Sequence, residues 1–151
     1  MNQFMKVAIN EARKGIKNGH GGPFGCVIVK DGEIVGKGHN QVIKKQDPTC
    51  HGEVMAIHDA CKKLGTFDLS GCELYTTGYP CPMCMGAILW ANIGKVYYGC
   101  NVVDTEDIGF RDKVFYEFTE EKKKEMIIEV DRKACLRLYD QYKKIEDKTN
   151  Y

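Results

Sequence analysis

Alternating apolar and polar positions divide the first part of the chain into a helix and a β-hairpin. Residues 2–18 place apolar side chains at helical spacing with lysine and arginine opposite, which is typical of an amphipathic helix, and Gly19 is a stop signal. Residues 26–29 form a near-continuous apolar run that predicts a strand. Asp31 and Gly32 then form a two-residue hairpin turn, and residues 33–38 return as the partner strand.

The same patterning predicts further helices and strands in the rest of the chain. A helix over residues 52–64 has an apolar face and ends at Gly65; the face is Val54, Ile57, Cys61 and Leu64. The later predicted elements are a strand over 73–77, a helix over 81–91, a strand over 95–99, a last short strand over 126–130 and a helix over 131–145. The second of these is apolar nearly all round, which predicts a helix buried against a sheet.

This order of elements indicates an α/β protein. The pattern α-β-β-α-β-α-β-β-α places one mixed five-stranded sheet between helices, in a three-layer α/β/α arrangement. Residues 101–116 show no clean periodicity, and the polar residues 146–151 are expected to be a disordered tail. With 151 residues and no repeat, the chain is expected to form a single domain over residues 1–151.

Composition narrows the classes of function. Apolar residues make up 43% of the chain and charged residues 28%, with a formal net charge of +1. Duplex nucleic acid usually requires a strongly basic face, so nucleic acid is not expected as a partner. No apolar run is long enough to span a membrane, and the N-terminus lacks the pattern of a signal peptide.

The eight cysteines indicate a compartment and, for three of them, a place in the core. Without a secretory signal, they predict a reducing cytoplasm in which thiols bind metal or lie buried. Cys26, Cys61 and Cys135 fall on apolar faces and are expected to be small core residues.

Two short stretches in the middle of the chain carry the candidate chemistry. Cys81 and Cys84 are three positions apart at the start of a predicted helix, so their sulfurs point the same way, and His51 offers an imidazole. Zn²⁺ takes such ligands readily, and three protein ligands leave a position for water, as in catalytic zinc sites. Glu53 follows His51 by two residues and is placed to move protons at that water. The pattern predicts one catalytic Zn²⁺ per chain.

The cysteine pair also has other interpretations. A C-x-x-C pair occurs in redox motifs, but a thioredoxin-type site has no spaced H-x-E and follows the first strand of a βαβ unit. A structural zinc site would need a fourth ligand, for which the candidates are Cys50, Cys72 and Cys100. The presence of both half-motifs, in order and at a distance that one helix and one strand can span, favours the catalytic site.

His51-Gly52-Glu53 followed by Pro80-Cys81-Pro82-Met83-Cys84 matches the H-x-E and P-C-x-x-C signature of zinc-dependent base deaminases. With these motifs the chain resembles the cytidine/deoxycytidylate deaminase superfamily. The resemblance implies a cytidine deaminase-like fold in which the two motif helices pack side by side on one face of the sheet. It also implies hydrolytic deamination, with Glu53 passing protons from the attacking water to a ring nitrogen and then to departing ammonia.

Within that superfamily, the chain resembles the bacterial guanine deaminases most. The resemblance rests on three stretches, Gly21-Gly22-Pro23-Phe24-Gly25, Asp47-Pro48-Thr49 and residues 107–112 followed by Phe115-Tyr116. Composition alone favours a simple turn for the first stretch, whereas the resemblance makes it a lining of the substrate pocket. The resemblance assigns proton shuttling and a purine contact to Asp112. It assigns substrate binding to Phe24, Asn40, Gly52, Trp90 and Tyr151.

The resemblance also implies a homodimer. The tail, about residues 146–151, would swap between subunits so that Tyr151 closes the neighbouring active site. Three positions depart from the family pattern. Gly52 replaces the usual Ala, Gly78-Tyr79 precedes Pro80 where purine-acting members usually have Glu, and Arg111 replaces an Asp.

The sequence therefore predicts a cytoplasmic zinc enzyme that converts guanine to xanthine and ammonia. The alternative substrates are cytosine, adenine or adenosine, guanosine and the wobble adenosine of tRNA. A non-enzyme alternative is a non-catalytic zinc-binding homologue, which would need to have lost Glu53, and this chain keeps Glu53.

Overall fold

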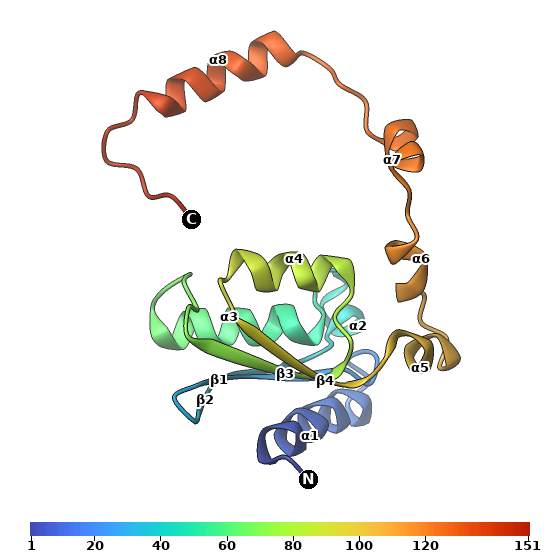
Figure 1. The fold of residues 1–151 in the computed structure, drawn as a ribbon. Coiled ribbons are helices and arrows are strands. Elements are labelled where there is room, and N and C mark those ends of the chain that lie inside the picture. The colour runs from blue at the N-terminus through green and yellow to red at the C-terminus, as the bar shows by residue number, and fades with distance from the viewer. The chain divides into compact units, whose positions relative to one another are not determined.

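The computed structural model describes residues 1–151, which form two units, residues 1–116 and 117–151. The first unit is built on a mixed sheet with the strand order β2-β1-β3-β4 (Figure 1). β1 pairs antiparallel with β2 and with β3, and β3 pairs parallel with β4. The bounds of these strands are β1 Gly25–Lys30, β2 Glu33–His39, β3 Cys72–Gly78 and β4 Lys95–Cys100.

Helices cover both faces of this sheet, which confirms the predicted three layers. α1 (Gln3–Lys17) packs on one face, and α3 (Gly52–Leu64) and α4 (Pro82–Trp90) lie on the other (Figure 1). Successive side chains of a strand point to opposite faces. Cys26 and Ile28 of β1 accordingly pack with α3 and α4, whereas Val27 and Val29 pack with α1. The apolar run of β1 is continuous because both of its faces are buried.

Small residues bring α3 close to β2. A Cβ atom on Gly36 would lie 2.6 Å from Cβ of Ala60, and one on Gly38 would lie 2.6 Å from the backbone nitrogen of Ala56. Real Cβ atoms do not approach other atoms so closely, so only glycine fits at these two positions of β2. The helix that faces them is correspondingly lined by alanine.

The buried face of α3 therefore differs from the predicted one. Its fully buried residues are Gly52, Glu53, Ala56 and Ala60, while the predicted Val54, Ile57 and Cys61 are partly buried and Leu64 is exposed. The bounds of the helix are as predicted, and Gly65 ends it in the left-handed conformation with φ of 65°.

Three short helices of the first unit left no clear pattern in the sequence. α2 (Val42–Lys45) follows β2, and α5 (Val102–Asp107) and α6 (Asp112–Tyr116) occupy the stretch without periodicity. α5 begins with a capping box, in which the Asn101 side chain accepts from the Asp104 N–H at 3.0 Å and the Asp104 carboxylate accepts from the Asn101 N–H at 2.8 Å. Helices this short contain too few turns for hydrophobic periodicity to appear.

The second unit corrects the predicted fifth strand. α7 (Glu120–Met126) and α8 (Arg132–Lys143) are its two helices, and residues 127–130 join no sheet. The β-branched run at 127–130 has strand propensity, but a strand also needs a neighbour that completes its backbone hydrogen bonds. The sheet therefore has four strands rather than five. Cys135, expected in the core, is exposed on α8, and the predicted helix over 131–145 is otherwise confirmed.

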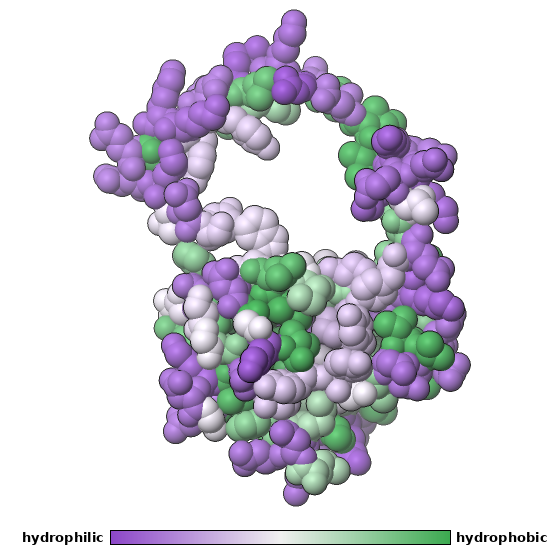
Figure 2. Space-filling model, in the orientation of Figure 1, coloured by the Kyte–Doolittle hydropathy of each residue, from purple (hydrophilic) through white to green (hydrophobic).

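α4 is apolar nearly all round, but only part of it is buried. Figure 2 shows apolar side chains gathered over this helix. Cys84 and Ile88 are its buried residues, and its large exposed side chains are Met83, Met85, Leu89 and Trp90. None of the helices of the chain combines the length and the apolar character that crossing a membrane requires.

Candidate active site

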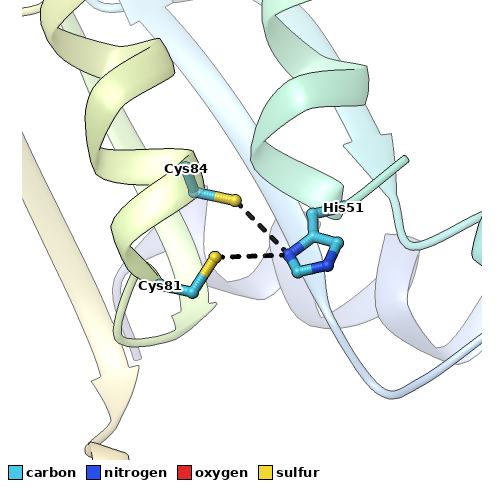
Figure 3. Close-up of side chains that lie close together, drawn as sticks. All are labelled: His51, Cys81 and Cys84. Carbon is cyan, nitrogen blue, oxygen red and sulfur yellow. Dashed lines mark hydrogen bonds between the residues drawn. The ribbon is translucent and has the colours of Figure 1, made fainter. Parts of the chain in front are cut away.

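The two motif helices bring one imidazole and two thiols together. His51 is the N-cap of α3, Cys81 is the N-cap of α4, and Cys84 lies in the first turn of α4. Figure 3 shows the three side chains pointing toward one another from the two helices. The Nδ1 atom of His51 lies 3.6 Å from Sγ of Cys81 and 3.5 Å from Sγ of Cys84. All three ligand atoms lie within 4.8 Å of one another.

This geometry fits a tetrahedral zinc ion. With Zn–S of about 2.3 Å and Zn–N of about 2.0–2.1 Å at tetrahedral angles, the sulfur and nitrogen ligands stand about 3.5 Å apart. The two nitrogen–sulfur separations in the structure, 3.6 and 3.5 Å, match that value. The cluster has three members, and it does not include Cys50, Cys72 or Cys100, the candidates for a fourth ligand. The donor set is therefore that of a catalytic site with an open position.

The electrostatic interactions among His51, Cys81 and Cys84 favour the binding of a cation. A hydrogen bond from the Cys84 thiol is the main cause that lowers the pKa of Cys81, and the same contact raises the pKa of Cys84. The contact with Cys81 also raises the pKa of His51. Two neighbouring sulfurs thus hold one proton between them, because two adjacent thiolates repel each other. A divalent cation relieves that repulsion and replaces the shared proton.

Glu53 lies beside this cluster in a buried position. The side chain projects from the first turn of α3, and its Oε2 atom lies 3.4 Å from Sγ of Cys84, within hydrogen-bond reach of that thiol. Burial is the main cause that raises the pKa of Glu53. A carboxyl group with a raised pKa exchanges protons near neutral pH more readily than an ordinary one. The structure therefore places an acid–base group next to the metal ligands.

Thr76, which the sequence analysis did not single out, fixes the other oxygen of Glu53. Its hydroxyl lies 3.0 Å from Oε1 of Glu53 and 3.1 Å from the carbonyl oxygen of Gly78. A hydroxyl has one proton, so Thr76 donates to one of these oxygens at a time. The available signal was a polar residue in the middle of a buried strand.

A cavity of about 610 Å³ opens beside the metal ligands and Glu53. Its aromatic wall is formed by Phe24 and Phe110, whose rings meet edge to face at 82° with centroids 4.8 Å apart. Both rings belong to the lining, as do His51 and Cys81. An aromatic wall next to a nitrogen- and sulfur-ligated metal site suits a planar heterocycle, which can meet one ring face to face and the other by its edge.

Asp112 and Arg111 line the same cavity from the start of α6 and the residue before it. Burial and, next, the negative charge of Cys81 raise the pKa of Asp112. The guanidinium of Arg111 lies 5.3 Å from the centre of the Phe115 ring. The structure thus brings the predicted Asp112 to the site from a segment whose sequence has no regular pattern.

Asn40 is buried at the end of the hairpin and also lines the cavity. Its backbone N–H donates to the carbonyl oxygen of Phe24 at 2.9 Å, and its side-chain oxygen accepts from the N–H of Val42 at 3.1 Å. These two bonds orient the side-chain amide. The predicted substrate residues Phe24 and Asn40 therefore lie together on one wall.

The structure does not bring Trp90 to the site. Trp90 is the last residue of α4, is 67% exposed and is not part of the cavity lining. The N-terminal end of α4 carries the ligands, and Trp90 lies about one and a half turns beyond Cys84, since a turn takes about 3.6 residues. Gly52 is buried at the start of α3, next to the ligand His51, without lining the cavity. Tyr151 belongs to the second unit and is 79% exposed.

Tyr116 is a second residue that the sequence analysis did not assign a role. Its hydroxyl donates to the carbonyl oxygen of Pro80, the residue before Cys81. Burial raises the pKa of Tyr116 to about 12, so the hydroxyl keeps its proton. Its ring also meets that of Tyr79, with centroids 6.0 Å apart. Tyr116 thereby ties α6 to the turn that presents the cysteine ligands.

Comparison with known proteins agrees with this geometry. Residues 1–100 match the cytidine and deoxycytidylate deaminase zinc-binding region. The chain belongs to this family. The match includes both motifs, so the chain is a zinc-dependent hydrolytic deaminase, and His51, Cys81 and Cys84 are positioned to hold its zinc ion.

Individual relatives include enzymes that act on different substrates. Guanine deaminase from Bacillus subtilis is 49% identical over 114 residues, which cover 76% of this chain and 73% of the relative. Its crystal structure has a TM-score of 0.92 at 40% identity and covers 100% of this chain and 99% of its own. A guanine deaminase from Nitrosomonas europaea has a TM-score of 0.69 at 31% identity and covers 72% of this chain and 63% of its own.

A tRNA-specific adenosine deaminase from Aquifex aeolicus is 47% identical over 95 residues, which cover 63% of this chain and 62% of the relative. The family and its chemistry are thus shared by relatives that act on free bases and on tRNA.

Proposed function

We propose that the protein is a guanine deaminase that converts guanine and water to xanthine and ammonia. The observation that carries this proposal is the convergence of the metal ligands, Glu53, the Phe24–Phe110 wall and Asp112 on one cavity. The similarity to guanine deaminase from Bacillus subtilis extends over the full length of both chains in structure. That extent includes residues 101–116, which lie outside the family match and supply Asp112.

Two sets of residues bind guanine, one through aromatic contacts and one through hydrogen bonds. Phe24 and Phe110 contact the faces and edge of the purine. The Asn40 oxygen is engaged by Val42, so its amide N–H groups are its donors to a base. Asp112 accepts from the N–H edge of the purine. The first-turn N–H groups near Gly52 and Cys84 stabilise negative charge that develops on the reacting base.

Glu53 carries the protons. A zinc ion held by His51, Cys81 and Cys84 would supply hydroxide at neutral pH, because it lowers the pKa of a coordinated water toward ~7. Glu53 accepts the proton that the attacking water gives up and delivers it to the ring nitrogen beside the amino-bearing carbon. The water oxygen bonds to that carbon and leaves a hydroxyl group on it. Glu53 takes the hydroxyl proton and passes it to the amino nitrogen as the carbon–nitrogen bond breaks, so that the carbonyl group of xanthine and ammonia are formed. Thr76 keeps the carboxyl group oriented through both transfers.

We further propose that the chain works as a homodimer with an exchanged tail. The exposed apolar side chains of α4 favour a protein partner for that helix. The second unit buries no residue of α7 or α8, and Leu138, Tyr139 and Tyr142 are exposed on α8. A second copy of the chain would cover both surfaces. We also expect the enzyme in the cytoplasm, because its eight cysteines are free thiols.

A panel of substrates tests the proposed function. Zinc-loaded protein is mixed separately with guanine, adenine, cytosine, guanosine and a tRNA with a wobble adenosine, and ammonia or inosine is measured. Guanine should give the highest kcat/KM of the panel. A higher kcat/KM for the tRNA than for guanine would indicate a tRNA-specific adenosine deaminase instead. If no substrate of the panel is turned over, the protein is a non-catalytic zinc-binding homologue.

A further inference from the structure

Three titratable side chains far from the metal ligands in sequence form a chain of hydrogen bonds. Glu11 of α1 and His39 at the end of β2 are both buried, and His20 in the loop after α1 is half-buried. The Oε2 atom of Glu11 lies 3.0 Å from Nδ1 of His39. The Nε2 atom of His39 lies 2.8 Å from Nδ1 of His20, with the ring planes 17° apart. We call these three residues the Glu–His–His relay.

The two rings of the relay share one proton in the contact between them. A nitrogen–nitrogen hydrogen bond contains one proton, so one ring donates and the other accepts. The Nδ1–H of His39 donates to the carboxylate of Glu11, which leaves Nε2 of His39 for the contact with His20. Either His20 donates to a neutral His39, or a protonated His39 donates to His20. In both cases His39 uses both of its nitrogens, so its ring has one fixed orientation.

His20 connects the relay to α2. The backbone carbonyl oxygen of His20 accepts from the N–H of Ile43 at 3.0 Å and from the N–H of Lys44 at 3.1 Å. Its own N–H donates to the carbonyl oxygen of Gly15 in α1 at 2.9 Å. The side chain of His20 is held by His39, so the residue is fixed through backbone and side chain together. The start of α2 is therefore hydrogen-bonded to the same residue whose ring contacts His39.

His39 connects the relay to Asn40. The two residues are adjacent, and a Cβ atom on Gly15 would lie 2.7 Å from the His39 ring, so α1 packs tightly against that ring. A Cβ atom on Gly21 would lie 2.1 Å from Oδ1 of Asn40, which shows how closely the loop after His20 contacts the Asn40 side chain. His39 of the relay thus adjoins Asn40 in the chain, and the loop that follows His20 packs against the Asn40 side chain.

The residues held in this way form one wall of the cavity. Gly21, Gly22, Asn40, Val42 and Ile43 all belong to its lining, whereas no member of the relay does. The metal ligands His51 and Cys81 belong to the lining through α3 and α4, which do not contain the relay. The relay thus supports the part of the site that contacts a base, separately from the part that holds the metal.

We propose that Glu11, His39 and His20 are positioning residues that hold the base-binding wall of the active site and thereby set substrate affinity. This inference rests on the proposed function for the nature of the ligand, a planar base. A buried carboxylate and imidazole are costly to desolvate, and an apolar pair of the same volume often gives equal stability. What the polar chain supplies in addition is direction, because its hydrogen bonds orient the rings of His39 and His20, the residues that adjoin Asn40 and the loop, where apolar packing would leave the rings free to turn.

Steady-state kinetics separate positioning from general stability. The variants are His20→Ala, His39→Leu and the conservative His39→Gln, whose amide can both donate and accept. His58→Ala serves as control, because His58 is an exposed histidine of α3 outside the relay. The substrate is whichever base of the panel is turned over fastest. We expect KM to rise about tenfold in His20→Ala and His39→Leu with kcat within about threefold, and His39→Gln to recover most of the loss. An unchanged KM, or a fall in kcat alone, would overturn the proposal.

Amide hydrogen exchange tests the relay without any substrate. In zinc-loaded His20→Ala, which keeps the buried pair Glu11–His39 intact, the N–H groups of Ile43 and Lys44 should exchange at least several times faster than in the wild type. The N–H groups in the first turns of α3 and α4 should be unchanged. Equal exchange at Ile43 and Lys44 in both proteins would overturn the relay even where guanine is the substrate. Faster exchange there would uphold the relay even where the panel selects another base.

Discussion

The hydroxyl of Thr76 lies 3.0 Å from Oε1 of Glu53, so strand β3 orients the carboxyl group that α3 supplies. We predict that Thr76→Val lowers kcat by roughly tenfold with a smaller effect on KM, because the substitution removes an orienting bond and leaves the aromatic wall intact. Thr76→Ser keeps the hydroxyl and should stay within a few-fold of the wild type. Equal kcat values in Thr76→Val and the wild type would show that Glu53 needs no support from β3.

Zinc content should be one ion per chain and should depend on the cysteine ligands. Removing the metal with a chelator should abolish turnover and lower the melting temperature, and adding zinc should restore both, because binding free energy adds to folding free energy. Cys84→Ser should lose zinc and activity. Cys100→Ser, which changes an exposed thiol outside the cluster, should keep both. Full zinc content and activity in Cys84→Ser would remove Cys84 from the ligand set.

Asp112 should matter more for a purine than for a pyrimidine. Asp112→Ala removes the acceptor for the N–H edge of guanine, so kcat/KM for guanine should fall tenfold or more, which corresponds to about 1.4 kcal/mol or more of transition-state stabilisation. The loss with cytosine should be smaller. Asp107→Ala is the matched control, because Asp107 ends α5 in the same segment and does not line the cavity. Equal losses with both bases would remove Asp112 from purine recognition.

The tail should act on the active site through its last residue. Deleting Asn150 and Tyr151 should raise KM or lower kcat for guanine by about tenfold or more, because an uncovered site admits water that weakens its electrostatics. Asn150→Ala retains Tyr151 and should behave like the wild type. If the deletion variant has the same KM and kcat as the wild type, Asn150 and Tyr151 have no role in turnover of guanine.

The metal site was predictable from the sequence because its residues stand at the starts of helices. His51 and Cys81 are N-caps, and a helix start is signalled locally by glycine, proline and the apolar residues that follow. The bounds of α3 were predictable for the same reason. The buried face of α3 was not, because it depends on Gly36 and Gly38 of β2, which are close to α3 only in the folded chain.

The sequence did not predict the roles of residues whose hydrogen-bond partners are far away in the chain. Thr76 and Tyr116 act through hydrogen bonds to Glu53 and Pro80, 23 and 36 positions away in the chain. Trp90, which was also assigned to the substrate site, lies at the other end of α4 from the ligands and outside the cavity lining, so its role stays a prediction. The stretch 127–130 shows that strand propensity alone does not form a strand without a neighbouring edge.

The most direct test of the account is turnover of guanine by Glu53→Gln at a zinc content equal to that of the wild type. The amide has nearly the shape of the carboxyl group but cannot accept and return a proton, and loss of general acid–base catalysis alone costs roughly 10²–10⁴-fold. We predict that the variant binds one zinc ion, folds normally and releases ammonia from guanine more slowly than the wild type by about 100-fold or more. Ammonia release within a few-fold of the wild type would contradict the central claim that Glu53 carries the protons of a zinc-dependent deamination.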